Sequence, residues 1–424
     1  MHIYFSGIGG TGIGPLALIC QQAGFDVSGS DMQDSQYTDY LAKHGVNLHI
    51  GQTTEQIQAV HNLKPIDWIV FSSAITTQNP KHPELLFAQA NHIKTSKRDE
   101  CLNMLIKEKN LKLIAVAGTH GKTTTTAMLV WLFEQLKIPL SYSVGAKMSF
   151  GPMGQFDPKS QYFVYECDEF DRNFLSFYPD LSIITAVDWD HHEIYPTRED
   201  YIQAFGRFIS QSHETLIYDK DANYLSFDGQ SAKILPAESE GTNSIKLAGA
   251  YIRQNAYLCV QAMHSLFGLP LDQIINAINL FPGVGRRFEK IANNIYSDYA
   301  HTPEEIQATL QKASELSKDV VVAYEPLTDR RQHYMQDQYR DVFNKAKMVY
   351  WLPSYLARED PSLPILQPED LIKHLSPETV AQPAQKNQQL KNDLAQAANN
   401  GSLVICIAGG GGGSLDEWAR KELV

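Results

Sequence analysis

Two glycine-rich turns constrain the fold of this chain more than any other feature. One spans residues 7–12 and the other residues 118–124, and each follows an apolar strand and precedes a helix. Glycines at such a turn let backbone N–H groups close around phosphate oxygens, and the helix N-terminus adds partial positive charge. The two turns therefore predict an α/β chain with two separate phosphate-binding sites.

The 118–124 turn has the stronger phosphate signature. Lys122 is placed to reach the β- and γ-phosphates of a nucleotide, and the Thr123 hydroxyl is placed to ligate magnesium. The match to a P-loop is imperfect because Val116 stands where the first glycine belongs. A plain strand–helix turn with a surface lysine is the alternative. We predict that ATP binds at Gly118, Thr119, His120, Gly121, Lys122, Thr123 and Thr124.

The 7–12 turn has the pattern GxGxxG, and Asp31 lies at the end of the next predicted strand. An NAD enzyme places its ribose-binding acid there, so this turn alone indicates an NAD-dependent oxidoreductase. A tight turn without a ligand is a second alternative. The pattern itself requires only a pyrophosphate at a helix N-terminus, and UDP carries one as NAD does.

The two turns together separate these alternatives. A dehydrogenase has no use for a second, P-loop-like turn, and an ATPase has no use for a separate Rossmann-like domain. A chain with both would use ATP to act on a second molecule that carries a diphosphate. The oxidoreductase remains the alternative from a different functional class.

Acidic residues follow the P-loop-like turn at the end of another apolar strand. The segment carries Glu166, Asp168, Glu169 and Asp171. Carboxylates at the carboxyl end of a strand suit magnesium coordination, because ligands of open α/β sheets bind at that edge. A solvated acidic loop is the alternative. The next apolar strand ends in DWDHH, and we expect one of its histidines to bind metal or phosphate.

Short apolar runs alternate with helix-length amphipathic stretches, which predicts parallel sheets covered by helices. We expect three domains, at residues 1–107, 108–282 and 283–424. Strands are predicted at residues 2–5, 25–30, 68–72, 111–117, 162–167, 181–187, 215–218, 295–298, 320–323, 348–352 and 403–407.

Composition limits the partners and the compartment. With 36 basic and 48 acidic side chains the formal net charge is −12, which disfavours nucleic acids and anionic membranes as partners. The 5 cysteines form no CxxC pair, so we expect a reducing compartment and no structural zinc. The first residues lack a signal-peptide pattern, and no run of about 18 apolar residues occurs. We expect a cytoplasmic protein.

The motifs resemble those of the Mur ligase family, in the family's order. GIGGTGIGPLA, SSAI, GTHGKTTTT, ECDEFDRNFL, DWDH, FPGVGRRFE and DYAHTPEEI cover nearly the whole chain. Two motifs have the form that is most similar to one branch of the family: GTHGKT contains a histidine, and DEFD is followed by an arginine. That branch adds L-alanine to UDP-N-acetylmuramate in peptidoglycan precursor synthesis. The ligase that recycles a murein tripeptide onto the same sugar is the alternative.

The resemblance implies a fold, an activity and site residues. The fold would combine a Rossmann-like UDP-binding domain, a central P-loop ATPase domain and a C-terminal Rossmann-like domain that receives the amino acid, in a monomer or homodimer. Lys122, Glu166 and His191 would be catalytic, and Thr123, Glu166 and His191 would bind Mg²⁺. Asn255, Arg287 and Asp298 would contact ATP. The UDP-sugar would bind at Gly7, Gly9, Gly10, Thr11, Gly12, Asp31, Ser72, Ser73 and Arg98.

The chain also departs from the family pattern. The GxHNxxN segment here keeps its last residue, Asn255, but has lost the histidine–asparagine pair. At the C-terminus, residues 409–413 are all glycine and precede Ser414. These glycines would present a substrate carboxylate to the helix that starts at Ser414, and a turn without a ligand is the alternative.

Overall fold

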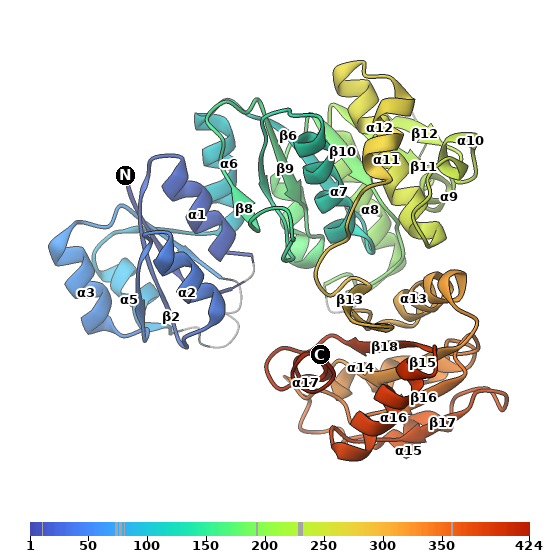
Figure 1. The fold of residues 1–424 in the computed structure, drawn as a ribbon. Helices are drawn as coiled ribbons and strands as arrows, with labels where there is room; N and C mark the ends of the chain where they lie inside the picture. The colour runs from blue at the N-terminus through green and yellow to red at the C-terminus, as the bar shows by residue number, and fades with distance from the viewer. Residues whose placement is uncertain are drawn as a thin grey trace. The chain divides into compact units, whose positions relative to one another are not determined.

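The computed structural model describes residues 1–10, 12–72, 75, 79, 81–191, 194–227, 232–357 and 359–424. These residues form three sheets flanked by helices (Figure 1), which confirms the predicted α/β fold class. The chain divides into two compact units, Met1–Glu240 with Ala256–Phe281 and Gly241–Asn255 with Pro282–Val424. The first two sheets belong to the first unit and the third sheet to the second.

The first sheet is parallel, in the order β3-β2-β1-β4-β5. Its strands are β1 (His2–Ser6), β2 (Asp26–Asp31), β3 (Asn47–Ile50), β4 (Trp68–Phe71) and β5 (Lys94–Lys97). The chain reverses its strand order between β1 and β4, and ligands of open α/β sheets bind beyond the carboxyl ends of the strands at such a point. The 7–12 turn follows β1 directly, so it lies at that edge.

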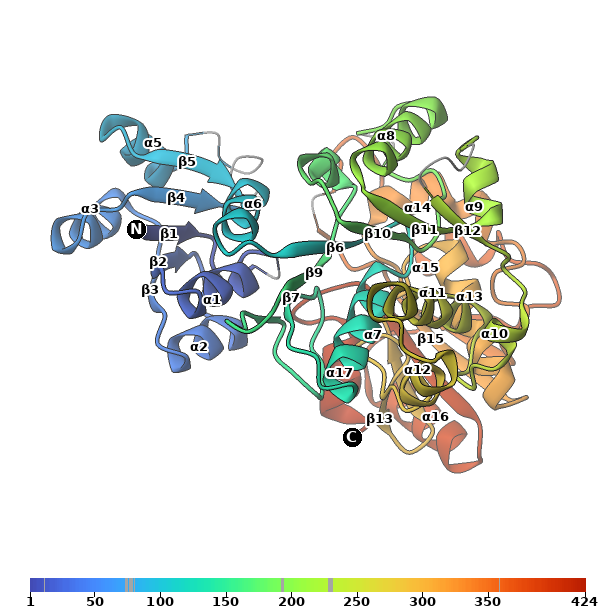
Figure 2. The ribbon, with the colours of Figure 1, turned by 90° about the horizontal axis from the view of Figure 1, so that it is seen from above.

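Helices cover both faces of the first sheet. They are α1 (Gly14–Gln22), α2 (Gln36–Lys43), α3 (Thr54–Leu63), α5 (Pro83–Ala90) and α6 (Arg98–Glu108). Figure 2 shows α1, α2 and α6 on one face and α3 and α5 on the other. Ile57, Phe87 and Tyr4 pack together under α3 and α5, and they are 0–4% exposed. Burial of such side chains is the main stabilising contribution to this layer.

The second sheet has the order β12-β11-β10-β6-β9-β7-β8 and is parallel except for the β7–β8 pair. Its strands are β6 (Lys112–Ala117), β7 (Ser141–Ser143), β8 (Gly154–Gln155), β9 (Tyr162–Glu166), β10 (Leu181–Ile184), β11 (Glu214–Tyr218) and β12 (Ala232–Leu235). The helices that follow or cover it are α7 (Lys122–Gln135), the 3-10 helix η1 (Phe170–Ser176), α8 (Arg198–Gln211), α9 (Asp219–Tyr224), α10 (Glu240–Asn243), α11 (Ala250–Phe267) and α12 (Leu271–Ile278).

The third sheet has the order β13-β14-β18-β15-β16-β17, with only the β13–β14 pair antiparallel among the described residues. Its strands are β13 (Glu289–Ala292), β14 (Ile295–Asp298), β15 (Val320–Glu325), β16 (Met348–Trp351), β17 (Ala381–Pro383) and β18 (Leu403–Ala408). Its helices are α13 (Pro303–Leu316), α14 (Asp329–Met335), the 3-10 helix η2 (Gln336–Tyr339), α15 (Pro368–Ile372), α16 (Gln388–Asn399) and α17 (Leu415–Glu422). β15 and β18 are fully buried, as apolar strands covered on both faces must be.

All eleven predicted strands are present, with ends that differ by up to three residues. The predicted strand at 181–187 ends earlier, at Ile184. Thr11 and Ser73, which we predicted to bind the UDP-sugar, lie outside the described residues. Within the described part of the chain, no helix has the length and apolar character needed to cross a membrane.

Candidate active site

The 118–124 turn forms a tight cradle between β6 and α7. Gly118 has φ +139° and Gly121, the residue before α7, has φ +85°, and L side chains rarely adopt either conformation. A Cβ at Gly118 would overlap Oγ1 of Thr185 and lie 2.7 Å from the carbonyl oxygen of Ala186. No side chain caps the start of α7. The cradle therefore fits a phosphate group, because the first N–H groups of the helix face its mouth.

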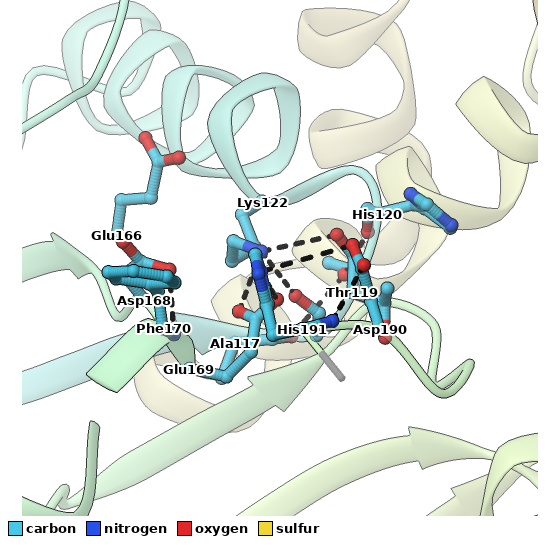
Figure 3. A network of polar contacts seen from close by, with 12 residues as sticks. Ala117, Thr119, His120, Lys122, Glu166, Asp168, Glu169, Phe170, Asp190 and His191 are labelled. Atoms are coloured by element: carbon cyan, nitrogen blue, oxygen red, sulfur yellow. Dashed lines mark hydrogen bonds and ion pairs between the residues drawn. The ribbon is translucent and has the colours of Figure 1, made fainter. Parts of the chain in front are cut away.

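Lys122 begins α7 and its ammonium group has three acceptors. Nζ lies 2.7 Å from Oε2 of Glu169, 2.6 Å from the carbonyl oxygen of Gly118 and 3.2 Å from that of Thr119. Figure 3 shows Lys122 reaching this group while the carboxylate of Glu166 stands apart from it. Phosphate oxygens that bind Lys122 must therefore replace contacts that the protein itself makes.

 The charges of Glu169 and Lys122 stabilise one another. Burial lowers the pKa of the Lys122 ammonium, but the nearby carboxylates of Glu169, Asp168 and Glu166 outweigh it, and the pKa lies above its ordinary value. Burial raises the pKa of the Glu169 carboxyl, but Lys122 and His191 outweigh it, and that pKa lies below its ordinary value. Both groups are therefore charged at neutral pH.

His191 lies on the other side of the Glu169 carboxylate. Its Nε2 is 3.5 Å from Oε1 of Glu169 and 3.9 Å from Oδ2 of Asp190. Burial lowers the pKa of His191, but these two carboxylates raise it above the ordinary value. The backbone of His191 is left-handed, with φ +55°, a conformation that points to a locally constrained loop. Lys122, Glu169 and His191 thus form one connected charge group (Figure 3).

Thr123 and Glu166 form a separate oxygen pair at the start of α7. Thr123 Oγ1 donates to Oε1 of Glu166 at 2.6 Å, and the backbone N–H of Gly145 donates to Oε2 at 2.9 Å. The register of β6 against β9 pairs Val116 with Glu166, so Glu166 stands beside the turn. Among the described residues no three His, Cys, Asp or Glu side chains converge on one point. Magnesium at nucleotide sites uses few protein ligands besides water and phosphate, so the Thr123–Glu166 pair fits it.

The 7–12 turn is shaped by contacts from neighbouring elements. Gly7 has φ +77°, and the N–H of Gly9 donates to Oδ2 of Asp31 at 2.8 Å. Asp31 therefore supports the turn itself. Gly10 lies within this turn, and a Cβ at Gly12 would overlap Nη1 of Arg98. The structure thus brings Asp31 and Arg98 to the predicted diphosphate turn, and Ser72 follows β4 at the same edge of the sheet.

The three remaining predicted ATP contacts belong to the second unit. Asn255 is buried in α11. The Arg287 guanidinium lies 5.0 Å from the centre of the Tyr299 ring. The Asp298 carboxylate accepts hydrogen bonds from the N–H groups of Phe288 and Ala300 and from the hydroxyl of Thr309. These bonds give Asp298 a structural role within its own unit.

The helix start after the C-terminal glycines carries the chain's own carboxylates. The N–H of Leu415, the first residue of α17, donates to Oε2 of Glu325 at 2.8 Å. Lys386 neutralises Glu325 through a contact of 2.5 Å from Nζ to Oε1. Since Glu325 already occupies this helix start, the structure favours the structural alternative over carboxylate binding there.

One residue of this site was missed from the sequence. Glu169 was recognised as one of four acidic residues but received no role. Its side chain is 1% exposed and contacts both Lys122 and His191. A buried carboxylate next to a P-loop-like lysine has no distinct sequence signature, because the direction of its side chain depends on the loop that follows β9.

Comparisons with known proteins identify the family. The fold and the site define a nucleotide-binding α/β enzyme with a second turn suited to a diphosphate. Residues 2–110 match the model of the Mur ligase family, catalytic domain, residues 116–234 match the Mur ligase middle domain, and residues 286–410 match the Mur ligase, glutamate ligase domain. The chain belongs to the Mur ligase family and is an ATP-dependent ligase of that kind. This membership overturns the alternative of an NAD-dependent oxidoreductase.

Individual relatives agree with this assignment. The chain is 31% identical to the UDP-N-acetylmuramate–L-alanine ligase of Fusobacterium nucleatum, over 88% of this chain and 87% of that protein. Its fold is similar to the crystal structure of UDP-N-acetylmuramate–alanine ligase from Thermotoga maritima, with a TM-score of 0.77, 24% identity and coverage of 100% and 98%. A murein peptide ligase from Psychrobacter arcticus has a similar fold, with a TM-score of 0.65, 20% identity and coverage of 100% and 98%.

Proposed function

We propose that the chain uses ATP to join L-alanine to the carboxylate of UDP-N-acetylmuramate, a step of peptidoglycan precursor synthesis. The observation that carries this proposal is the presence of two phosphate-suited turns in one compact unit. The 118–124 turn holds Lys122 beside a metal-suited oxygen pair, and the 7–12 turn holds Arg98. Relatives with this activity and substantial identity over most of the chain support the choice of substrates.

The chemistry follows from the weakness of a carboxylate as an acyl donor. Transfer of the γ-phosphoryl group of ATP to the sugar carboxylate forms an acyl phosphate and releases ADP. The neutral amine of L-alanine then attacks the acyl carbon, and inorganic phosphate leaves with the electron pair of the broken C–O bond. The nitrogen gives up one proton, which the leaving phosphate can accept, and the amide bond is complete. The protein contributes positioning and charge neutralisation to these steps.

Lys122 supplies the charge neutralisation. In the described conformation its ammonium group binds Glu169 and two backbone carbonyls. Phosphate oxygens at the cradle would take over some of these contacts, so that Lys122 stabilises the negative charge on the transferring group. Glu169 holds the lysine in the cradle until then. Magnesium held by Thr123 and Glu166 would add positive charge at the same oxygens.

The proposal includes the site assignments made from the sequence. ATP would bind at the 118–124 turn and at Asn255, Arg287 and Asp298, and metal would bind at Thr123, Glu166 and His191. The UDP-sugar would bind at the 7–12 turn with Asp31, Ser72, Ser73 and Arg98. We further propose domain boundaries near residues 107 and 282, a cytoplasmic location, and a monomer or homodimer.

Phosphate release from ATP tests the proposal. The purified chain is incubated with ATP, Mg²⁺ and UDP-N-acetylmuramate, and with L-alanine, glycine, L-serine or the murein tripeptide in separate reactions. We expect release that requires both the sugar nucleotide and L-alanine. Release only with the tripeptide would make the chain a recycling ligase. Absence of release with every acceptor, despite ATP binding, would overturn the proposal.

A further inference from the structure

Arg98 lies between the 7–12 turn and the acidic loop that follows β9. It is the first residue of α6 and follows β5 directly, so it stands at the carboxyl edge of the first sheet, as the 7–12 turn does. Its guanidinium occupies the space that a side chain at residue 12 would fill, because a Cβ there would overlap Nη1. Only glycine at residue 12 lets Arg98 approach the turn this closely.

The same guanidinium also faces the acidic loop after β9. Nη2 of Arg98 lies 3.6 Å from Oδ2 of Asp168. Asp168 is two residues from Glu166, which binds the Thr123 hydroxyl at the start of α7. One side chain therefore connects the predicted diphosphate turn with the acidic loop of the P-loop site.

The contact with Asp168 is open to exchange. The side chains of Arg98 and Asp168 are 27% and 37% exposed, so an incoming anion can reach the guanidinium. Ion pairs of this exposure are weak, and a diphosphate carries more negative charge than one carboxylate. The surrounding loop is held independently, because Lys97 pairs with Asp171 and the Ser176 hydroxyl donates to Asp99. Loss of the Arg98–Asp168 contact would leave these anchors in place.

We propose that Arg98 is shared between the diphosphate of the sugar nucleotide and the Asp168 carboxylate, so that each nucleotide strengthens the binding of the other. A diphosphate at the 7–12 turn draws Arg98 away from Asp168, and the uncompensated carboxylate makes the acidic loop more attractive to the magnesium nucleotide. Positive charge at that loop in turn weakens the hold of Asp168 on Arg98. The coupling has the same sign in both directions, as linkage requires. This inference rests on the proposed function.

Calorimetric titration with UDP tests the inference in the full chain. UDP is titrated in the absence of metal and nucleotide, and again with saturating Mg²⁺ and a non-hydrolysable ATP analogue. We expect the analogue to tighten UDP binding by about fivefold in the unchanged protein. Asp168→Asn should tighten UDP binding about threefold without metal, because the competing charge is gone. In this variant the ratio of the UDP affinities with and without the ATP analogue should be close to one. Arg98→Ala should weaken UDP binding and also remove the coupling.

Asp171→Asn is the matched control. It removes the same charge from the same loop, but Asp171 pairs with Lys97. Asn also tolerates the left-handed backbone of residue 171, where φ is +54°. We expect the control to keep the UDP affinity and the coupling within twofold of the unchanged protein.

Three outcomes would overturn the inference. Equal effects of Asp168→Asn and Asp171→Asn would assign the change to the general charge of the loop. Coupling that persists in Asp168→Asn would show that the Arg98–Asp168 contact does not carry it. Failure of the unchanged protein to bind UDP would remove the proposed function as well, whereas UDP binding with no coupling would remove this inference alone.

Discussion

The ammonium group of Lys122 and the carboxylate of Glu169 form an ion pair of 2.7 Å whose acidic partner is 1% exposed. Glu169 lies in the loop after β9 and Lys122 at the start of α7, so the pair joins two elements that flank the cradle. Removing one partner of a buried pair leaves the other charge uncompensated, which costs more than the pair itself contributes. The pair therefore sets both the position of Lys122 and part of the local stability.

Glu169→Gln should destabilise the protein because it removes the carboxylate that pairs directly with Lys122. We expect the free energy of unfolding to fall by about 3 kcal/mol, measured by urea unfolding of the ligand-free chain. Glu100→Gln is the control, since the Lys94–Glu100 pair is 50% and 55% exposed and should change stability by less than about 1 kcal/mol. Equal unfolding midpoints for Glu169→Gln and the unchanged protein would contradict the assigned role.

Glu166→Gln should weaken magnesium binding, so that the enzyme requires more Mg²⁺. The substitution removes the charge that pairs with the Thr123 hydroxyl, and we expect the Mg²⁺ concentration for half-maximal phosphate release to rise about tenfold or more. Affinity for UDP in the absence of metal should stay the same. Glu134→Gln, on an exposed residue near the end of the same helix α7, controls for a general change of charge. An unchanged magnesium profile would remove Glu166 from the metal site.

The sequence predicted the interior of the sheets better than their edges. The buried strands β6, β15 and β18 are continuous apolar runs, and these three were predicted. The six edge strands β3, β5, β8, β12, β13 and β17 were all missed. β5 reads Lys-Thr-Ser-Lys and β17 reads Ala-Gln-Pro, so neither has the apolar alternation from which a strand is recognised. Their strand conformation depends on a neighbouring strand that supplies hydrogen bonds.

In the candidate site, too, some contacts were predicted from the sequence and others were not. Thr123 and Glu166 were predicted together, and the register that pairs Val116 with Glu166 brings them into contact. The pairing of Lys122 with Glu169 was not predicted. It depends on the backbone of the acidic loop, in which Asp171 and Arg172 adopt left-handed conformations that no local sequence signal requires.

Gly118→Ala should disrupt the cradle, whereas Gly412→Ala should be tolerated. A Cβ at residue 118 would overlap Oγ1 of Thr185 and strain a backbone with φ +139°, so we expect a loss of about 3 kcal/mol in stability and loss of ATP binding. A Cβ at residue 412 meets no atom of the described residues within 4 Å. Thermal unfolding and ATP titration of both variants check this contrast. Normal ATP binding by Gly118→Ala would contradict the tight geometry of the turn.

Asp221→Asn should stabilise the protein at neutral pH. Burial raises the pKa of the Asp221 carboxyl to about 6 from its ordinary value of 3.8. Oδ1 accepts the N–H of Val187 at 3.0 Å, while Oδ2 is buried and has no hydrogen-bond partner among the described residues. Because the folded state binds the proton more tightly than the unfolded state, stability falls as pH rises from about 4 to about 6 and stays lower above that range. Asparagine keeps the acceptor for Val187 and cannot ionise.

The advantage of Asp221→Asn should therefore grow with pH. We expect the variant to exceed the unchanged protein by about 2 kcal/mol at pH 7.5 and by much less at pH 4.5, measured by urea unfolding at both values. Asp219→Asn, on an exposed residue of the same helix α9, controls for the loss of one negative charge. A stability difference that is the same at both pH values would contradict this prediction. It would mean that folding does not raise the pKa of the Asp221 carboxyl.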